Sequence, residues 1–565
     1  MSLYGSIRLA ANTLRADQIA LQVVGQNIAN ANTPGYIREE VLLTPAAAQR
    51  KGKLLLGLGV NVEAVVQKID HFLEERLRGA VSERMGAETE ESTYMQLESV
   101  IGELSDTDLS TAMSAFFNSM NEVLNQPESV SVRNLAVLQG VTLSADINRL
   151  GDRVLQMRTD LNRRVSNMAD DINRLTEEIR VLNIRIANTE GGDVSASDAV
   201  GLRDQRLVAL ERLSELVDIR VQEQPSGGVA VYAGGDFLVF EGTSRQVEIG
   251  TEGEDGLSLS YVKLSDIDAR LNPAGGELAG LMAARDEILG GFLDRLDDFA
   301  GNLAFEFNKV YSQGQGLHGY RQLTSEFGAS DTAAALSDAG LVFTPTNGSF
   351  QVIVRNKQTD QTKTTDITVD LNGIGDETSL EDLTAALDAV EGLSAEVTLG
   401  GKLALASDSV DQEFIFSGDT SGVLAALGLN TFFSGSSARD IGVNQVVRDD
   451  PATFAASRGG LGVDTDNAVE LAAFLDRPIA SRNNASLTVL YDRLTSETTQ
   501  ASAITQAAAE GARTFETTLR GQKLATSGVS LDEEAVRMMA FQRSFQASAR
   551  YITTLSELLG MLVQL

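Results

Sequence analysis

Cysteine is absent from this sequence of 565 residues, which excludes disulfide bonds, thiolate metal sites and a cysteine nucleophile. Long apolar runs are absent too, because no segment approaches the roughly 18 uninterrupted apolar residues of a membrane-spanning helix. Near the N-terminus, Arg8, Asn12, Arg15 and Asp17 interrupt any apolar core of a signal peptide. We therefore expect a chain without membrane insertion and without a signal peptide of this kind.

Positive charge is scarce. The chain has 46 Lys and Arg against 79 Asp and Glu, for a formal net charge of −33. No basic cluster interleaved with aromatic residues offsets this balance. A surface of this sign repels phosphate backbones and anionic membranes, so we expect no nucleic-acid partner.

Catalytic and metal-binding motifs are also missing. Residues 314–319 match the letters of a dinucleotide-binding GxGxxG, but they end a predicted helix, whereas that fingerprint follows a strand and begins a helix. The two histidines, His71 and His318, are far apart in sequence and have no partners at ligand spacing. The sequence predicts no catalytic residue, no cofactor and no metal site.

Heptads occupy both ends of the chain. The N-terminal positions are Leu3, Ile7, Ala10, Leu14, Asp17, Leu21, Val24 and Ile28. The C-terminal positions are Met538, Phe541, Phe545, Ser548, Ile552, Leu555, Leu559 and Leu562. A stripe with a spacing of 3.5 residues is typical of helices that bury it against another helix. Either the two ends pair with each other and with neighbouring copies, or each stripe faces one globular core.

The longest predicted helix lies inside the chain, where an apolar seam runs from Ile147 to Ile186. Its steps from Met157 to Leu161 to Val165 are both four residues, which predicts a stutter. Further helices are expected at about 68–104, 108–125, 198–217, 276–312 and 484–526. Two β-rich stretches, at 218–264 and about 340–447, interrupt the helices. Because helices flank the second stretch on both sides, we expect an insertion whose two connections lie side by side.

The expected fold is multidomain and mainly α with β-rich insertions. Residues 1–40 with 528–565 form paired N- and C-terminal coiled-coil helices. Residues 41–318 with 452–527 form a long helical rod domain that includes β hairpins near 218–264. Residues 319–451 form an inserted β-rich outer domain.

A helix stop follows the first heptad stripe, in the sequence Asn27-Ile28-Ala29-Asn30-Ala31-Asn32-Thr33-Pro34-Gly35-Tyr36. Asparagines suit the end of a helix, proline disfavours a helical Thr33, and Pro34-Gly35 fits the centre of a type II turn. Near the other end of the chain, Gly528 ends one predicted helix. Ser530 and Glu533 predict a capping box at the start of the next.

Two strings carry a family resemblance. Residues 27–36, with the turn residues Asn27, Asn30, Asn32, Thr33, Pro34, Gly35 and Tyr36, resemble the N-terminal signature of the flagellar rod, hook and hook-associated axial proteins. Residues 528–534 and 541–550 resemble the matching C-terminal signature. The helical middle, with Leu202-Arg203-Asp204-Gln205-Arg206, is similar to the helical domain of flagellin and the junction proteins. Flagellin lacks the Thr-Pro-Gly-Tyr turn, so the chain resembles members of the family that join hook to filament.

This resemblance implies a non-enzymatic structural subunit, exported through the flagellar channel and located in the extracellular flagellum between hook and filament. Assembly would use the terminal stripes, which we expect to be ordered, with Leu555 buried, only after assembly. The implied partners are further copies in a ring, the hook protein on one side, the next junction protein on the other, and an export chaperone on the C-terminal helix. The alternatives are the second junction protein, flagellin, a distal rod subunit, or an adhesin or enzyme carried by the β-rich insert.

Overall fold

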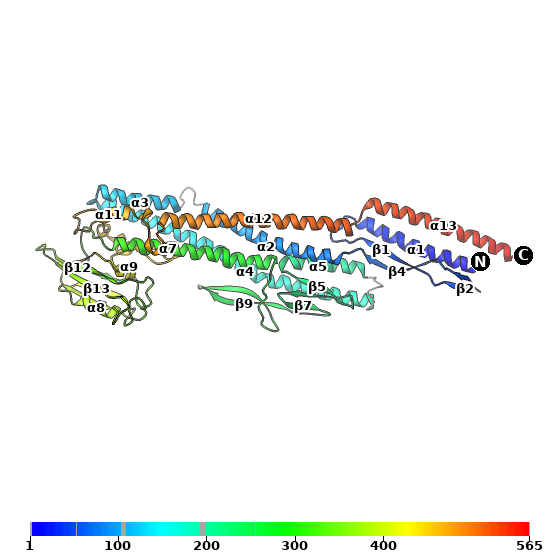
Figure 1. Ribbon diagram of the computed structural model, residues 1–565, viewed down its shortest axis with the longest axis horizontal. Coiled ribbons are helices and arrows are strands. Elements are labelled where there is room, and N and C mark those ends of the chain that lie inside the picture. Colours follow the sequence, from blue (N-terminus) through cyan, green and yellow to red (C-terminus); the bar gives the residue numbers. More distant parts are fainter. Residues whose placement is uncertain (1–2, 52–53, 103–108, 192–198, 255, 564–565) are drawn as a thin grey trace. The chain divides into compact units, whose positions relative to one another are not determined.

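The computed structural model describes residues 3–51, 54–102, 109–191, 199–254 and 256–563 (Figure 1). Helices make up the larger part of it and strands a smaller part. The chain divides into two compact units. Unit 1 contains Met1–Thr93, Asp160–Arg285 and Ala503–Leu565, and unit 2 contains Tyr94–Thr159 and Asp286–Ser502.

The helices predicted from periodicity are present. The predicted helices near 68–104, 108–125, 198–217 and 484–526 are α2 (His71–Gly102), α3 (Leu109–Asn125), α5 (Val200–Leu216) and α12 (Leu487–Ser527). The range 276–312 contains α6 (Gly276–Ala283), a π-helical segment (Ala284–Gly290) and α7 (Gly291–Tyr311). The periodicity did not predict the π-helical segment, because apolar spacing alone does not separate it from an α-helix.

The long internal helix α4 (Val130–Glu190) extends beyond the predicted seam at both ends. From Ile147 to Ile186, every predicted seam position except Met157 is buried. Arg158, 4% exposed, takes the inward place instead. The two consecutive steps of four therefore run from Leu150 to Val154 to Arg158, two positions earlier in the seam than expected.

In unit 1, α1 (Leu3–Asn30) packs against α13 (Leu531–Val563) and against the antiparallel pair β1 (Glu39–Pro45) and β4 (Val60–Gln67) (Figure 1). A second short pair is formed by β2 (Gln49–Lys51) and β3 (Leu54–Leu56). None of these strands was predicted. The alternation along β1 is broken by a bulge between Leu42 and Leu43, which leaves both leucines exposed.

The predicted β hairpins at 218–264 form two sheets. One contains β5 (Arg220–Glu223), β6 (Val229–Ala233), β7 (Asp236–Phe240) and β8 (Thr243–Ser244), and the other contains β9 (Val247–Glu254) and β10 (Leu257–Leu264). Three asparagines of α4, Asn162, Asn173 and Asn183, each donate to a backbone carbonyl of these strands at 2.8–2.9 Å and accept from a backbone N–H at 2.7–3.0 Å. The side-chain amides thus bind strand backbone as a neighbouring strand would.

Unit 2 contains the predicted insert. One sheet has the order β13 (Thr362–Val369), β12 (Gly348–Asn356), β16 (Gln412–Ser417), and the other has the order β11 (Gln322–Thr324), β15 (Leu403–Ser407), β14 (Leu393–Val397). With α8 (Leu380–Asp388) and α9 (Val423–Leu427), these strands enclose one hydrophobic core. After the core come β17 (Phe433–Ser434), β18 (Gly442–Val443), α10 (Gln445–Asp449) and α11 (Asp466–Ala472).

The two connections of the insert lie side by side, as the nested order predicted. Gln315 N–H donates to Ser457 O at 2.7 Å, and Leu317 N–H donates to Ala452 O at 2.8 Å. This contact explains the GxGxxG letters. A Cβ at Gly316 would lie 2.6 Å from Ala452 O, and one at Gly319 would lie 2.8 Å from Phe414 O. These glycines permit close backbone packing between the connections.

Each of the two histidines has a carboxylate nearby. Nε2 of His71 lies 3.9 Å from Glu223, and Nε2 of His318 lies 2.9 Å from Asp450. Within the described ranges, no three His, Cys, Asp or Glu side chains are grouped as metal ligands. None of the helices in those ranges is both long enough and apolar enough to cross a bilayer.

Candidate assembly site at the chain ends

The helix stop after α1 is held by its own side chains. Asn30 Oδ1 accepts a hydrogen bond from Thr33 Oγ1 at 3.2 Å, and Tyr36 N–H donates to Thr33 O at 3.2 Å. Gly35 has φ of +78°, as the third residue of a type II turn requires. A Cβ at Gly35 would also clash with Val208 of α5. Asn32, Thr33, Pro34 and Gly35 are exposed, so the turn presents its own surface.

Asn27 connects this turn to the C-terminal helix. Its Oδ1 accepts from Tyr36 OH at 2.8 Å and from Glu39 N–H at 3.0 Å. Its Nδ2 donates to Glu39 O at 3.0 Å and to Glu534 Oε2 at 3.1 Å. Asn27 is 1% exposed and Glu534 is 0% exposed. Because unmet polar groups are costly when buried, this network specifies how the two chain ends meet.

Arg38 completes the connection. Its Nε donates to Glu534 Oε1 at 2.8 Å, and its Nη1 lies 2.8 Å from Glu533 Oε2. Its backbone N–H donates to Ser527 O at 3.0 Å. The predicted capping box is therefore half present: Ser530 Oγ accepts from Glu533 N–H at 3.4 Å, while the Glu533 carboxylate binds Arg38. This role of Arg38 and Glu534 was not predicted from the sequence, although both residues lie in or beside the two signature strings.

A second carboxylate, that of Asp204, lies close to the turn. Asp204 of α5 accepts from Gln67 Nε2 at 2.6 Å and from Ile37 N–H. Burial, reinforced by the charge of Glu39, raises the pKa of Asp204 to about 7. Burial also raises the pKa of Glu39. Asp204 thus titrates near neutral pH, and both carboxyl groups hold a proton more readily than in the unfolded chain.

The buried face of α1 contains the predicted stripe and is wider than it. Of the eight predicted positions, Ala10, Asp17 and Val24 are buried, Ile7, Leu14, Leu21 and Ile28 are half-buried, and the side chain of Leu3 lies outside the described residues. The buried positions beyond the stripe are small or polar, apart from Val23: Ser6, Ala16, Ala20, Val23 and Asn27. Burial raises the pKa of Asp17, against a hydrogen bond from Ser544 of α13. Small side chains allow the two helices to approach closely.

The C-terminal stripe on α13 contains both buried and exposed positions. Met538, Phe541 and Ile552 are half-buried, Phe545 and Leu559 are 37% and 36% exposed, and the side chain of Leu562 lies outside the described residues. Leu555 is only 6% exposed in the single chain, because α13 already packs on α1. The expectation that Leu555 is buried only after assembly is therefore wrong.

Large apolar side chains remain exposed on these paired helices. On α13 they are Leu531, Val536, Met539, Phe545, Tyr551, Leu558, Leu559 and Met561. On α1 they are Tyr4 and Leu9. Tyr4, Leu9 and Tyr551 also line a cavity of about 330 Å³ with Leu56 and Leu58. Large apolar side chains exposed in this number on one helix pair are typical of an interaction site.

Known protein families match both ends of the chain and part of its middle. The family described as flagella basal body rod protein matches residues 7–36, and the C-terminal family of the flagellar basal body rod FlgEFG proteins matches residues 520–565. These two matches contain the network residues Asn27, Tyr36 and Glu534. The family described as the flagellar hook-associated protein FlgK helical domain matches residues 94–327.

Individual relatives match along the chain. Flagellar hook-associated protein 1 of Salmonella typhimurium is 23% identical over 99% of both chains, and that of Escherichia coli is 24% identical over 99% of both. The Bacillus subtilis protein of the same name is 26% identical over 55% of this chain and 67% of its own. The flagellar hook junction protein FlgK from Burkholderia pseudomallei shares the fold, with a TM-score of 0.54 at 14% identity over 80% of this chain and 100% of its own. From its two signature ends, the helical domain between them and relatives that match it over nearly its full length, this chain belongs to the family of flagellar hook-associated protein 1.

Proposed function

We propose that this chain is a structural subunit of the bacterial flagellum that forms the junction between hook and filament. The observation that carries the proposal is the pairing of α1 and α13, which hold each other through a buried network and leave large apolar side chains on their outer faces. A single soluble chain has no use for such a surface, whereas a subunit between neighbours buries it.

Assembly is then driven by this exposed surface. Burial of one large apolar side chain contributes about 1.5–3 kcal/mol, so a few per helix give association a substantial driving force. The small inward residues of α1 set the spacing of the helix pair, and the outward residues contact other subunits. The mechanism is mechanical, and the relatives, which are structural flagellar proteins, support a role other than that of an enzyme.

The partners follow from the same assignment. Copies of the chain associate in a ring, with the hook protein on one side and the next junction protein on the other. The subunit reaches the extracellular flagellum through the flagellar export channel, with an export chaperone bound to α13.

We also propose that α1 and α13 form a coiled coil, and that 1–40 with 528–565, 41–318 with 452–527, and 319–451 act as separate domains. The second junction protein, flagellin, a rod subunit, an adhesin and an enzyme are less favoured, because the relatives above match nearly the whole chain.

The test uses side chains that are exposed before assembly. Met539 and Leu558 are 52% and 44% exposed on α13. The double variant Met539→Asp, Leu558→Asp places charge on the outer face without disturbing the α1 contact. In a strain lacking the native gene, we expect this variant to be secreted and folded but unable to hold filaments on hooks, as seen by electron microscopy.

The matched control is Glu557→Gln, which changes an exposed residue of the same helix. It should restore filaments fully. Secreted protein in the medium is measured for both variants, because loss of chaperone binding would also remove filaments. Full filaments and normal swimming with the double variant would show that the outer face of α13 is not an assembly surface.

A further inference from the structure

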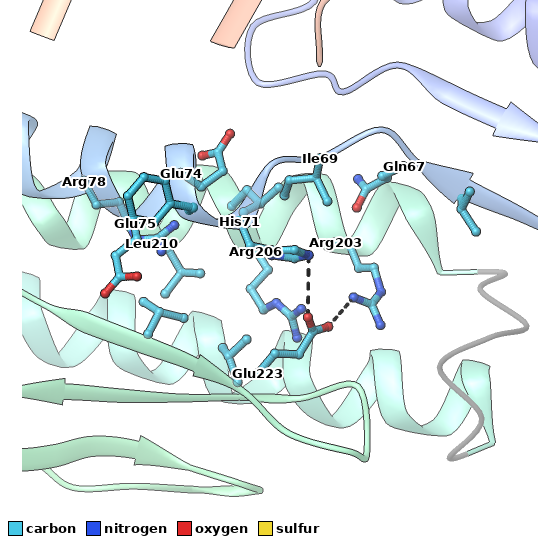
Figure 2. Close-up of a pocket in the computed structure, with 15 residues that line it drawn as sticks. Gln67, Ile69, His71, Glu74, Glu75, Arg78, Arg203, Arg206, Leu210 and Glu223 are labelled. Atoms are coloured by element: carbon cyan, nitrogen blue, oxygen red, sulfur yellow. Dashed lines mark hydrogen bonds and ion pairs between the residues drawn. The ribbon is translucent and has the colours of Figure 1, made fainter. Parts of the chain in front are cut away.

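A pocket of about 510 Å³ opens in unit 1 beside α2, α5 and β5 (Figure 2). Three arginines line it: Arg78 comes from α2, and Arg203 and Arg206 come from α5. Glutamates line it as well, at positions 74, 75 and 223.

Two of the charges are matched. Arg203 donates to both carboxylate oxygens of Glu190 at 2.8 Å and to Glu223 at 2.6 Å. Glu74 lies 2.9 Å from Nζ of Lys523. These groups need no further ion.

Among the described residues, no carboxylate accepts a hydrogen bond from Arg206 or Arg78, although carboxylates lie close enough for their charge to act on both: Glu190 and Glu223 on Arg206, and Glu74, Glu75 and Glu211 on Arg78. Arg206 is 4% exposed and donates only to neutral oxygens, Asn183 Oδ1 at 3.0 Å and Gly227 O at 2.7 Å. Arg78 is 8% exposed, its Nε is buried without an acceptor, and none of the described residues accepts a hydrogen bond from its guanidinium. Burial lowers the pKa of both groups, for Arg206 to about 10. A buried cation without a partner is costly, and an acceptor that enters the pocket would remove that cost.

The mouth of the pocket is exposed. The side chain of His71 is 68% exposed, and Phe72 is 69% exposed. The guanidinium of Arg76 lies 5.8 Å from the ring centres of both Phe72 and Phe515. An apolar and cationic rim around a polar pocket suits a protein segment that carries an acidic residue.

We propose that this pocket receives a carboxylate side chain from a second copy of the chain, bound by Arg78 and covered by Phe72. The proposal rests on the function proposed above, because it requires copies of the chain side by side. The occupant follows from charge complementarity: the chain carries 79 acidic residues against 46 basic ones, so neighbouring copies present carboxylates to each other.

The chemistry selects a carboxylate. A planar guanidinium donates two parallel hydrogen bonds to one carboxylate group. The carboxylates of Glu74, Glu75 and Glu223 line the same pocket and would repel a dianion such as phosphate. A single negative charge with two oxygens therefore fits the pocket better than a phosphate group.

The experiment places a photoreactive benzoyl-phenylalanine at Phe72 of the full-length chain and irradiates isolated flagella. We expect a crosslink between two copies, mapped by mass spectrometry to a segment that contains Asp or Glu. Arg78→Leu should lower the yield of crosslinked dimer about tenfold, as expected for loss of a hydrogen-bonded charge. Arg220→Gln, which removes one positive charge from an exposed site on β5, should keep the yield.

Thermal melting of the purified chain separates binding from a structural role. Because none of the described residues accepts a hydrogen bond from the buried guanidinium of Arg78, Arg78→Leu should melt at the same temperature or higher, and Arg78→Lys should give intermediate crosslinking. A melting temperature that falls would assign Arg78 to folding and overturn the proposal. Crosslinks only to another protein, or a yield independent of Arg78, would overturn it too. Neither result touches the proposed function, which fails only if the wild-type chain does not restore filaments.

Discussion

The chain buries its apolar residues in opposite ways at two places. In unit 2, Phe116, Phe307 and Phe432 form a cluster with ring centres 5.4–5.6 Å apart, and all three are fully buried. At the paired ends of unit 1, alanine, serine and asparagine face inward, while Met539, Leu558 and other large side chains face outward. The first region has the core of a protein that is complete by itself. The second has the surface of a protein that is completed by neighbours.

Buried amides accompany both arrangements. In unit 2, Asn308 Oδ1 accepts from the N–H groups of Phe432 and Phe433 at 3.0 Å and fixes the chain beside the aromatic cluster. At the ends, Asn27 fixes the turn against Glu534. Polar contacts therefore specify position in both regions, but only unit 2 adds a large apolar core to them. Unit 2 should be the more stable of the two regions in the single chain.

The largest loss of stability is expected from the aromatic cluster. Phe432→Ala should lower the free energy of unfolding of unit 2 by about 3–5 kcal/mol, because a buried ring is replaced by a cavity. Urea unfolding followed by circular dichroism measures this loss. Val342→Ala is the control, since Val342 is 54% exposed and its change should stay within about 0.5 kcal/mol. A loss below about 1 kcal/mol for Phe432→Ala would contradict the cluster's role.

The next effect should be local. Glu534→Ala removes the buried carboxylate that accepts from Arg38 Nε and Asn27 Nδ2, at a cost of about 3 kcal/mol, so α13 should open from α1. Hydrogen exchange should become about 100-fold faster at the protected amides of α13 and stay unchanged in α7. Glu533→Ala removes a side chain that is 62% exposed and should have little effect. Unchanged exchange in α13 after Glu534→Ala would show that the network does not hold the ends together.

A smaller effect should depend on pH. The folded chain holds a proton on Asp204 up to a pKa of about 7, whereas the unfolded chain releases it near 3.8. Between these values the folded state binds more protons, so stability falls as pH rises through this window and levels off above it. From pH 5.5 to pH 8 the loss should be about 1–2 kcal/mol. Asp204→Asn should reduce this loss, and an unchanged pH profile would exclude Asp204 as its source.

The smallest effect is expected on the outer face of α13. Met539→Ser and Leu558→Ser should each change the free energy of unfolding of the single chain by less than about 0.5 kcal/mol, because both side chains are already exposed. The same substitutions should weaken attachment of filaments. If either one destabilised the single chain by more than 1 kcal/mol, α13 would have an intramolecular partner on that face.

Helices and turns were predicted well where a local sequence pattern decides the structure. Periodicity placed the helices, and the Pro34-Gly35 pair predicted the turn that Gly35 adopts at φ of +78°. The stripe predicted on α1 was only part of its buried face, because the heptad rule follows large apolar residues. Ser6, Ala20 and Asn27 also point inward and lie outside that stripe. A sequence read for one chain cannot separate a core face from a face kept for other subunits.

Individual side-chain contacts between distant residues could not be predicted. Arg38 and Glu534 are 496 positions apart, and no local pattern pairs them. Glu533 fitted a capping box by its spacing, but the carboxylate binds Arg38 instead. The helix α8 was also missed, although Ser379 and Asp382 form a complete capping box at its start. This capping box can be recognised in the sequence, but it lies inside a stretch that was predicted to form strands.

The insert begins and ends at hydrogen-bonded neighbours, with Leu317 N–H bound to Ala452 O. Its hydrophobic core also consists of its own residues, from Tyr320 to Leu429. The chain therefore leaves and re-enters the rest of unit 2 at one place, as at the base of a stem. Residues 320–429 could therefore be replaced in the flagellum by an antigen, an enzyme or a binding domain whose ends meet, while Phe432 and Phe433 stay in the aromatic cluster. This property makes the junction a natural position for surface display.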